Sequence, residues 1–117
     1  MLNDMKKVTI YHNNRCSKSR EALSILQQEN LEIEIIEYLK ESLSYDKIKN
    51  IYNLLDEEDK SKFIRVKEKE YDNITNDIID SVVKFPKLLE RPIIILGNKA
   101  IIARPMDKLY NLLKEEK

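Results

Sequence analysis

The residues best suited to chemistry lie in one short stretch, residues 11–20, which reads YHNNRCSKSR and holds the only cysteine and the only histidine of the chain. A strand-like apolar run ends here and an amphipathic helical pattern begins, so Cys16 should lie near a helix N-terminus. Free backbone N–H groups and the positive end of the helix dipole favour the thiolate there, which is the nucleophilic form of cysteine. Arg15, Lys18 and Arg20 add positive charge nearby. We therefore expect Cys16 to be a nucleophile that attacks an anion.

Cys16 and Ser19 form a Cys-x-x-Ser motif, in which the serine could donate a hydrogen bond to the thiolate. The alternative is an inert buried cysteine, for which polar and basic flanking residues are unusual. Because the chain has no second cysteine to resolve an adduct on Cys16, turnover requires an outside thiol such as glutathione or a glutaredoxin. His12 either tunes Cys16 or has a structural role within the loop.

Three arginines are candidate ligands for an anion. Arg65 follows two apolar residues at the expected end of a short helix, whereas Arg91 and Arg104 each precede a proline at the two ends of an expected hairpin. Both hairpin ends lie at one edge of a sheet, so Arg91 and Arg104 should converge. A guanidinium group binds tetrahedral oxyanions through its planar fork. Surface ion pairing is the alternative, and it is the commoner role of any single arginine.

The first third of the chain predicts a strand, a helix and a second strand. Residues 7–11 and 32–38 alternate as strands do, and Ala22, Leu23 and Leu26 recur at helical spacing between them. We expect Ser17 or Ser19 to cap this helix and the helix to end near residues 29–30. A strand–helix–strand unit of this length predicts two parallel strands with a right-handed crossover.

Residues 44–83 show helical periodicity. Ser44 can cap a helix with Ile48, Ile51, Leu54 and Leu55 on one face. An acidic turn at residues 56–59 begins a short helix that should end near residues 63–65. Thr75 or Asn76 can cap a third helix, which residues 85–86 end. These helices predict a helical insert over about residues 42–86.

Two short strands and a helix complete the predicted domain. Residues 92–96 are apolar throughout, as a central strand covered on both faces would be. Gly97-Asn98 predicts a tight turn to an antiparallel strand at residues 99–103. Pro105 suits the first turn of a last helix. Its expected inner face consists of Met106, Leu109, Tyr110 and Leu113. The whole order predicts one α/β domain over residues 1–117, a thioredoxin-like mixed sheet with flanking helices and a helical insert.

The composition restricts which classes of partner we expect the protein to bind and in which cellular compartment we expect it to act. Lys plus Arg total 21 and Asp plus Glu total 21, a balance that argues against nucleic-acid binding. The sequence contains no apolar run long enough to cross a bilayer, so we expect no membrane attachment. A single cysteine cannot form an internal disulfide, which favours the reducing cytoplasm. We assign no metal ligand and no tightly bound cofactor.

Several separate motifs together carry a family resemblance. They are residues 11–20, Glu37-Tyr38-Leu39, Arg65-x-Lys67-Glu68-x-x-Tyr71, Pro86-Lys87-Leu88-Leu89-Glu90-Arg91-Pro92-Ile93 and Arg104-Pro105. In this order and spacing, over nearly the whole chain, they resemble the glutaredoxin-linked arsenate reductase (ArsC) family. The resemblance implies a thioredoxin-like fold with a helical insert, and Cys16 as a nucleophile that forms a thiol–arsenate adduct. The implied oxyanion ligands are Arg65, Arg91 and Arg104.

The resemblance also implies roles around the cysteine and the partners of the reaction. His12 and Ser19 match positions that flank the family's reactive cysteine, and Pro92 is expected to follow a cis peptide bond. Asn14 stands where the family usually has proline. Glutathione, as co-substrate, and glutaredoxin would complete the reduction of arsenate, or of a similar oxyanion, to arsenite.

Two other functions use the same fold. A general glutathione-linked thiol oxidoreductase would need Cys16 but not the three arginines. A non-catalytic Spx-like regulator would bind RNA polymerase, and such regulators usually switch through a Cys-x-x-Cys pair. Ser19 in the second position of the motif, and the match at residues 104–105, argue against the regulator.

Overall fold

The computed structural model describes residues 6–65 and 77–115. Four strands are present in this part of the chain: β1 (Lys6–Tyr11), β2 (Leu31–Ile36), β3 (Ile93–Leu96) and β4 (Lys99–Ile102). The α-helices are α1 (Ser17–Gln27), α2 (Tyr45–Leu54), α3 (Glu57–Lys60), α4 (Ile78–Lys84) and α5 (Asp107–Glu115), and a short 3-10 helix, η2 (Pro86–Leu88), precedes β3. The elements between β2 and β3 are all helical, as predicted.

The strands form one mixed sheet in the order β2-β1-β3-β4. β1 and β2 are parallel, and β3 is antiparallel to both of its neighbours. Gly97, the only glycine of the chain, has φ 64° in the turn between β3 and β4, a conformation that disfavours residues with a side chain. The predicted cis bond between Arg91 and Pro92 is confirmed, and the bond between Arg104 and Pro105 is also cis. This is the thioredoxin-like arrangement that the element order predicts.

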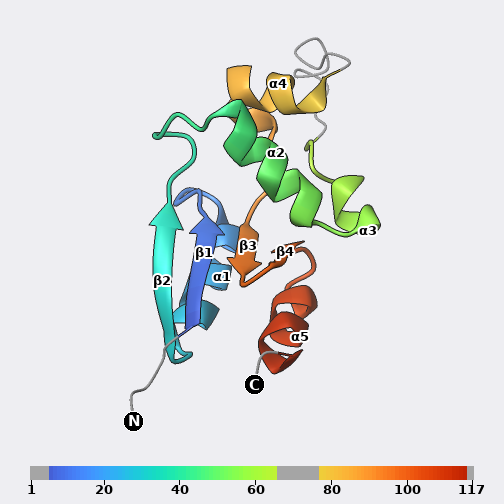
Figure 1. Ribbon diagram of the computed structural model, residues 1–117. Coiled ribbons are helices and arrows are strands. Elements are labelled where there is room, and N and C mark those ends of the chain that lie inside the picture. The colour runs from blue at the N-terminus through green and yellow to red at the C-terminus, as the bar shows by residue number, and fades with distance from the viewer. Residues whose placement is uncertain (1–5, 66–76, 116–117) are drawn as a thin grey trace.

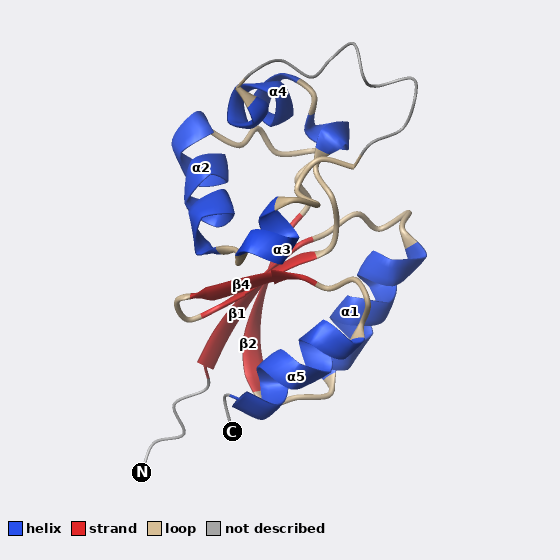
Figure 2. Ribbon diagram, turned by 90° about the vertical axis from the view of Figure 1, so that its right-hand side faces the viewer, coloured by secondary structure: helices blue, strands red, loops and turns tan. Residues whose placement is uncertain are grey.

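Helices cover the two faces of the sheet unequally. α1 and α5 lie against one face, and α2, α3 and α4 lie toward the other, beyond one end of β1 and β2 (Figures 1 and 2). β3 is covered on both faces, because Ile94 belongs to the α1–α5 core and Ile93 to the core under the insert. The prediction of a central, doubly covered strand from residues 92–96 is therefore confirmed.

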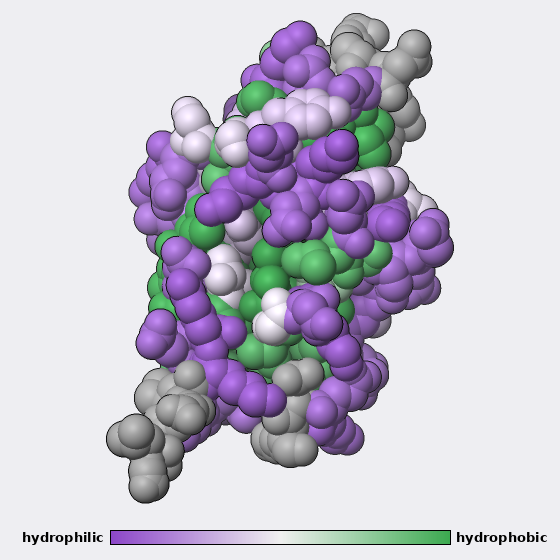
Figure 3. Space-filling model, in the orientation of Figure 1, coloured by the Kyte–Doolittle hydropathy of each residue, from purple (hydrophilic) through white to green (hydrophobic). Residues whose placement is uncertain are grey.

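The part of β1 and β2 that the insert leaves uncovered carries polar side chains. Thr9 donates a hydrogen bond to Glu34 (3.2 Å), and Lys7 pairs with the same carboxylate (3.5 Å). Apolar side chains appear on this side mainly between α2 and α5, where β3 and β4 lie (Figure 3). The alternation of polar and apolar residues in β1 thus follows which face is covered by a helix.

Several predicted boundaries of helices and strands differ from those in the structure. Cys16 itself is the N-cap of α1, in place of Ser17 or Ser19, and the helix ends at Gln27, short of residues 29–30. β2 ends at Ile36, two residues before the predicted end. The expected cap of α2 is confirmed, because the Ser44 side chain accepts a hydrogen bond from the backbone of Lys47 (3.1 Å).

The second helix of the insert is shorter than predicted. α3 ends at Lys60, and residues 63–65 are instead held beside residues 88–90 by backbone hydrogen bonds. The predicted caps Thr75 and Asn76 lie outside the described residues. Asp77 caps α4, its side chain accepting from the backbone of Asp80 (3.1 Å).

The predicted inner face of the last helix is wrong at one position. α5 begins at Asp107, so Pro105 precedes the helix and does not lie in its first turn. Tyr110 is 50% exposed, and Leu112 packs in the core instead. Leu109, Leu112 and Leu113 form an equally good helical stripe, and this stripe leaves the tyrosine hydroxyl in water.

Asp59 fastens the insert to the sheet and to α5. Its carboxylate is fully buried, accepts the backbone N–H of Ile102 in β4 (3.1 Å) and pairs with the ammonium of Lys108. Glu58 also pairs with Lys108 (3.1 Å). Burial lowers the pKa of Lys108, but the hydrogen bonds that its ammonium donates to the carboxylates of Asp59 and Glu58 outweigh burial, so the pKa is raised above its ordinary value. None of the described helices has the length and apolar character needed to cross a membrane.

Candidate active site

Cys16 lies where the loop after β1 turns into α1. Its backbone N–H donates to the carbonyl of Asn13 (2.9 Å), and its carbonyl accepts the N–H of Arg20 (3.0 Å), which begins the helix. The Cys16 side chain is 8% exposed and forms no capping hydrogen bond. The sulfur therefore sits at the helix N-terminus, as predicted, beside the backbone N–H groups of the first turn.

The environment of Cys16 favours its ionised form. Burial raises the pKa of the thiol, but the backbone N–H groups of Ser19 and Lys18 and the guanidinium of Arg91 outweigh it. The pKa of Cys16 is consequently lowered from the ordinary value of 9.0. A larger fraction of the sulfur is thiolate near neutral pH than in a free cysteine, which makes it a better nucleophile.

His12 and Ser19 shape the loop around the cysteine. Nδ1 of His12 is hydrogen-bonded to the Ser19 hydroxyl (2.7 Å), and that hydroxyl also accepts the backbone N–H of Asn13 (3.0 Å). Both side chains are buried. The Ser19 hydroxyl is therefore engaged away from the sulfur, and Ser19 acts on Cys16 through its backbone N–H instead of the expected side-chain bond.

Hydrogen bonds also fix the part of the loop that lacks the usual proline. Oδ1 of Asn13 accepts the backbone N–H of Arg15 (3.0 Å), and the carbonyl of Asn14 accepts from the Arg20 side chain (2.9 Å). Arg20 thus holds the loop, and Lys18 pairs with Glu21 (3.8 Å). Of the three cations near Cys16 in sequence, only Arg15 lines the cleft described below.

Arg104 and Arg91 converge at the sulfur, as their places at the two hairpin ends predict. Nη2 of Arg104 donates to Sγ of Cys16 (3.3 Å), and Nε of Arg104 donates to the carbonyl of Arg91 (2.6 Å). Glu90 lies beside this pair, with a carboxylate oxygen 3.8 Å from Nε of Arg104. One guanidinium group therefore connects the end of the hairpin to the Cys16 sulfur.

Arg65 reaches the same region from the insert. Its backbone N–H donates to the carbonyl of Leu88 (2.7 Å), and Ile64 forms an antiparallel bridge with Leu89. These bonds lay residues 63–65 along the segment that leads to Arg91. A residue that the sequence places in a separate helical region is thereby brought to the active-site edge of the sheet.

A cleft of about 230 Å³ collects the cationic side chains. Its lining residues are Asn13, Arg15, Tyr38, Leu39, Arg65, Lys87 and Arg91. Four of these are cations, and no carboxylate lines the cleft within the described part of the chain. Nε of Arg91 is buried and has no hydrogen-bond partner among the described residues. A buried donor without a partner is costly, so this nitrogen is suited to a bound anion.

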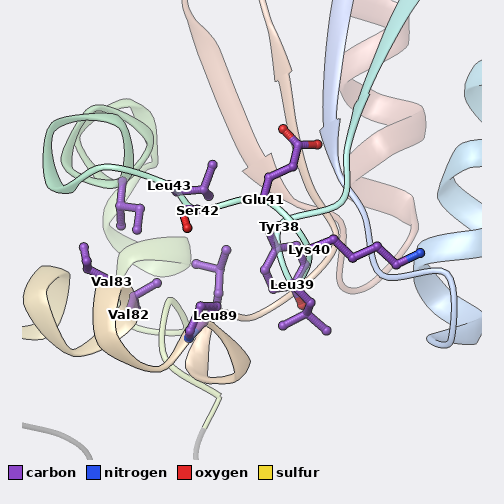
Figure 4. Close-up of a pocket in the computed structure, with 11 residues that line it drawn as sticks. Tyr38, Leu39, Lys40, Glu41, Ser42, Leu43, Val82, Val83 and Leu89 are labelled. Atoms are coloured by element: carbon purple, nitrogen blue, oxygen red, sulfur yellow. The ribbon is translucent and has the colours of Figure 1, made fainter.

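Two further hollows adjoin the cleft. One, of about 290 Å³, is lined by His12, Asn13, Asn14, Arg15, Glu37, Leu39 and Lys40. The other, of about 210 Å³, lies between the loop after β2 and helix α4, with Leu43, Val82, Val83 and Leu89 around it (Figure 4). Lys40 extends away from this apolar hollow, whereas Tyr38 forms part of its wall (Figure 4). Leu39 lines all three spaces, and Tyr38 lines two.

Some residues of the cleft were not among the sequence candidates. Tyr38, Lys87 and Asn13 line it, although only the arginines were predicted to do so. Tyr38 follows a strand parallel to β1, and the carboxyl ends of parallel strands meet at one edge, which was a usable signal. No group of three or more His, Cys, Asp or Glu side chains arranged to hold a metal ion occurs within residues 6–65 and 77–115.

Comparison with known proteins identifies relatives of the whole chain. The model of the ArsC family matches residues 11–112. An arsenate reductase of Neisseria meningitidis is 34% identical, over 93% of this chain and 100% of the relative. An uncharacterized Escherichia coli protein, YfgD, is 33% identical, over 92% of this chain and 98% of its own length. The structure of an arsenate reductase from Vibrio cholerae superposes with a TM-score of 0.82 at 31% identity, covering 92% of this chain and 98% of that one.

Proposed function

Because the chain belongs to the ArsC family, we propose that it is an arsenate reductase in which the Cys16 thiolate attacks arsenate held by Arg65, Arg91 and Arg104. The observation that carries the proposal is the junction between nucleophile and anion site. Cys16 receives a hydrogen bond from Arg104 and has a lowered pKa, and the charged residues that line the neighbouring cleft are all cations within the described part of the chain. Arsenate reductases among the relatives, at 34% and 31% identity, support arsenate as the oxyanion.

The arginines make the first step electrostatically possible. A thiolate and an arsenate dianion repel each other, and guanidinium groups placed around both offset that repulsion. The sulfur–arsenic bond forms, and one arsenate oxygen leaves as water after taking up protons from solvent. The first external thiol attacks the Cys16 sulfur, so the sulfur–arsenic bond breaks with its electron pair left on arsenic, which passes from the +5 to the +3 state, and Cys16 is left in a mixed disulfide. A second external thiol breaks that disulfide, so the two external thiols end as one disulfide. Arsenite is released, and Cys16 returns to the free thiol.

The second hollow supports glutathione as the first of these thiols. It shares Asn13, Arg15 and Leu39 with the anion cleft, so a molecule in it lies beside the loop that carries Cys16. Unlike the cleft, it offers charges of both signs, from Arg15, Lys40 and Glu37. Glutathione carries two carboxylates and one ammonium group, which such a lining complements. A glutaredoxin in the reducing cytoplasm would then regenerate the enzyme.

A coupled assay tests the proposed function. Purified protein is mixed with arsenate, glutathione, glutaredoxin, glutathione reductase and NADPH, and arsenate-dependent NADPH oxidation is followed. The wild-type protein should turn over, and mass spectrometry should find glutathione attached to Cys16 only when arsenate is present. Turnover on a glutathionylated peptide that greatly exceeds turnover on arsenate would instead identify a general thiol oxidoreductase. Absence of both activities would overturn the proposal.

A further inference from the structure

We propose that the hydroxyl of Tyr38 is a fourth ligand of the oxyanion, an uncharged hydrogen-bond donor that acts beside the three arginines. The inference rests on the proposed function for the identity of the anion, but its structural argument requires only that an oxyanion binds the cleft. Tyr38 lines that cleft together with Arg65 and Arg91.

The position of Tyr38 is fixed from both sides. It follows β2 by two residues, and the carbonyl of Ile36 at the end of β2 accepts the backbone N–H of His12 (2.8 Å). The loop that carries Cys16 and the segment that carries Tyr38 are thereby joined at one edge of the sheet. The tyrosine ring packs in the core beneath the insert, with only 1% of the residue exposed.

The hydroxyl of Tyr38 has unused hydrogen-bonding capacity. No hydrogen bond joins it to another described residue, and because it is not among the buried polar atoms without a partner, it keeps contact with the open space of the cleft that Tyr38 lines. Nε of Arg91, on the wall of the same cleft, is likewise without a partner there. An oxyanion in the cleft can accept from the Tyr38 hydroxyl and lie against the guanidinium of Arg91, whose Nε has no other partner there, because a tetrahedral oxyanion has four oxygens to share.

Electrostatics make Tyr38 a donor and not a proton-transfer group. Burial is the main reason that the pKa of Tyr38 is raised to about 12, and the nearby charges of Arg91, Cys16, Glu90 and Arg104 contribute smaller, opposing effects. The phenol therefore stays protonated at neutral pH and can donate to the anion in any ionisation state. The phenol of Tyr38 adds no positive charge, so it holds the oxyanion without lowering the pKa of Cys16 further. This matters because the intrinsic nucleophilicity of a thiolate falls as its pKa falls.

The test compares anion binding in Tyr38→Phe and wild-type protein. The rate of Cys16 alkylation by iodoacetamide is measured at increasing concentrations of phosphate, an unreactive analogue, and then of arsenate. Half-protection is the anion concentration at which the alkylation rate falls to half of its value without anion. A hydrogen bond to a charged group predicts half-protection at roughly 10-fold or more higher anion concentration in the variant. The alkylation rate without anion should change by less than about two-fold, because the pKa effect between Tyr38 and Cys16 is minor.

Tyr110→Phe is the matched control, because it removes the same hydroxyl from a half-exposed tyrosine on α5. It should leave half-protection unchanged. Equal half-protection in Tyr38→Phe and wild-type protein would overturn the inference, and so would a loss of protection that Tyr110→Phe reproduces. Wild-type protein gives a second readout that needs no variant: phosphate binding should produce a tyrosine difference band in the near-ultraviolet spectrum, and its absence would also count against Tyr38.

The outcomes separate this inference from the proposed function. If phosphate and arsenate protect Cys16, and Tyr38→Phe weakens that protection, Tyr38 is an oxyanion ligand even when the coupled assay shows no arsenate reduction. If the coupled assay succeeds while Tyr38→Phe protects as well as wild-type protein, the reductase stands and the role of Tyr38 falls. If neither anion protects wild-type Cys16, both fall.

Discussion

Two clusters of polar groups in this protein are each assembled from distant segments, but they differ in how far their hydrogen bonds are completed within the described residues. In one, Asp59 from α3 meets β4 and α5, and its carboxylate oxygens are taken by the backbone of Ile102 and by Lys108. In the other, Arg91 and Arg104 meet at Cys16, Arg65 lines the adjacent cleft with Arg91, and Nε of Arg91 has no partner within the described residues. Both bring charges from segments far apart in the sequence, but only the first is complete by itself.

The difference teaches how a structural cluster is distinguished from a binding site. Buried polar groups are almost always hydrogen-bonded, because an unmade bond costs most of the desolvation of that group. A satisfied cluster such as that of Asp59 therefore stabilises the fold. A cluster beside a cleft that leaves a donor without a partner is suited to bind a ligand. Breaking each cluster should accordingly affect a different quantity.

The largest effect should come from removing the nucleophile. Cys16→Ser should reduce arsenate-dependent NADPH oxidation to the level without enzyme, because the hydroxyl is not appreciably ionised at neutral pH and cannot form the adduct. The free energy of unfolding should change by less than about 1 kcal/mol, since the side chain caps nothing. Retained activity in this variant would remove Cys16 from the mechanism.

Breaking the satisfied cluster should cost stability without disabling the thiol. Asp59→Asn removes one partner of a buried ion pair and should lower the free energy of unfolding by about 3 kcal/mol. Urea denaturation measures the change. Lys84→Ala, which breaks the surface pair with Asp80 (3.0 Å), is the control and should cost at most about 0.5 kcal/mol. Similar losses for the two variants would mean that the Asp59 cluster does not stabilise the fold as described.

Removing arginines from the cluster at Cys16 should weaken anion binding and have little effect on stability. Arg91→Ala and Arg104→Ala should each weaken anion protection of Cys16 by about 2 kcal/mol, roughly 30-fold. Arg91→Ala should lower the free energy of unfolding by at most about 1 kcal/mol, because the loss of its interaction with Cys16 is offset by removal of a buried Nε that has no partner among the described residues. Lys47→Ala, at an exposed position of α2, is the control for lost positive charge. If it weakens protection as much as the arginine variants do, the anion is held by net charge and not by the cleft.

A smaller effect should appear in the pH dependence of alkylation. The rate of reaction with iodoacetamide follows the thiolate fraction, which rises with pH, and the lowered pKa places its midpoint below 9.0. Arg91→Ala removes one of the groups that lower this pKa, so the midpoint should move upward. Ser17→Ala, at an exposed position of the same helix turn, should leave it in place. An unshifted midpoint in Arg91→Ala would show that the backbone N–H groups alone tune the thiol.

The smallest expected effect is the loss of stability at alkaline pH when Lys108, the partner of Asp59, loses its charge. The pKa of Lys108 is raised in the folded protein, so its ion pairing stabilises the fold fully at pH values below 10.5. That contribution is lost as the pH rises through the folded-state pKa. The stability of the wild-type protein should therefore fall faster above pH 10.5 than that of Lys108→Met, as thermal unfolding across this range would show. Parallel curves would contradict the raised pKa.

The sequence predicts the parts of the fold that depend on local pattern. The strands, the insert and the hairpin follow from periodicity and from the Gly97-Asn98 turn, and the convergence of Arg91 and Arg104 follows from their places at its two ends. Arg65 could be chosen as a candidate, but its position depends on the pairing of residues 63–65 with 88–90, which the helical reading of this segment did not contain.

Other parts of the site could not be predicted because they depend on tertiary packing. Asp59 is one of four consecutive acidic residues, and nothing in that run distinguishes the carboxylate that becomes buried. Tyr38 has the pattern of a strand residue, and only the folded chain shows that it lines the cleft beside Arg65 and Arg91. Boundary errors such as that at Tyr110 arise where two helical stripes fit the sequence equally well.

The turn at Gly97 has a consequence for how this family can tolerate changes in length. β3 and β4 pair over four residues on each strand, so the count of residues around that turn sets where Arg91 and Arg104 meet. Inserting or deleting one residue in the hairpin would shift the register, turn side chains to the opposite face and separate the two guanidinium groups. Natural variation in length should therefore be rare between residues 91 and 104.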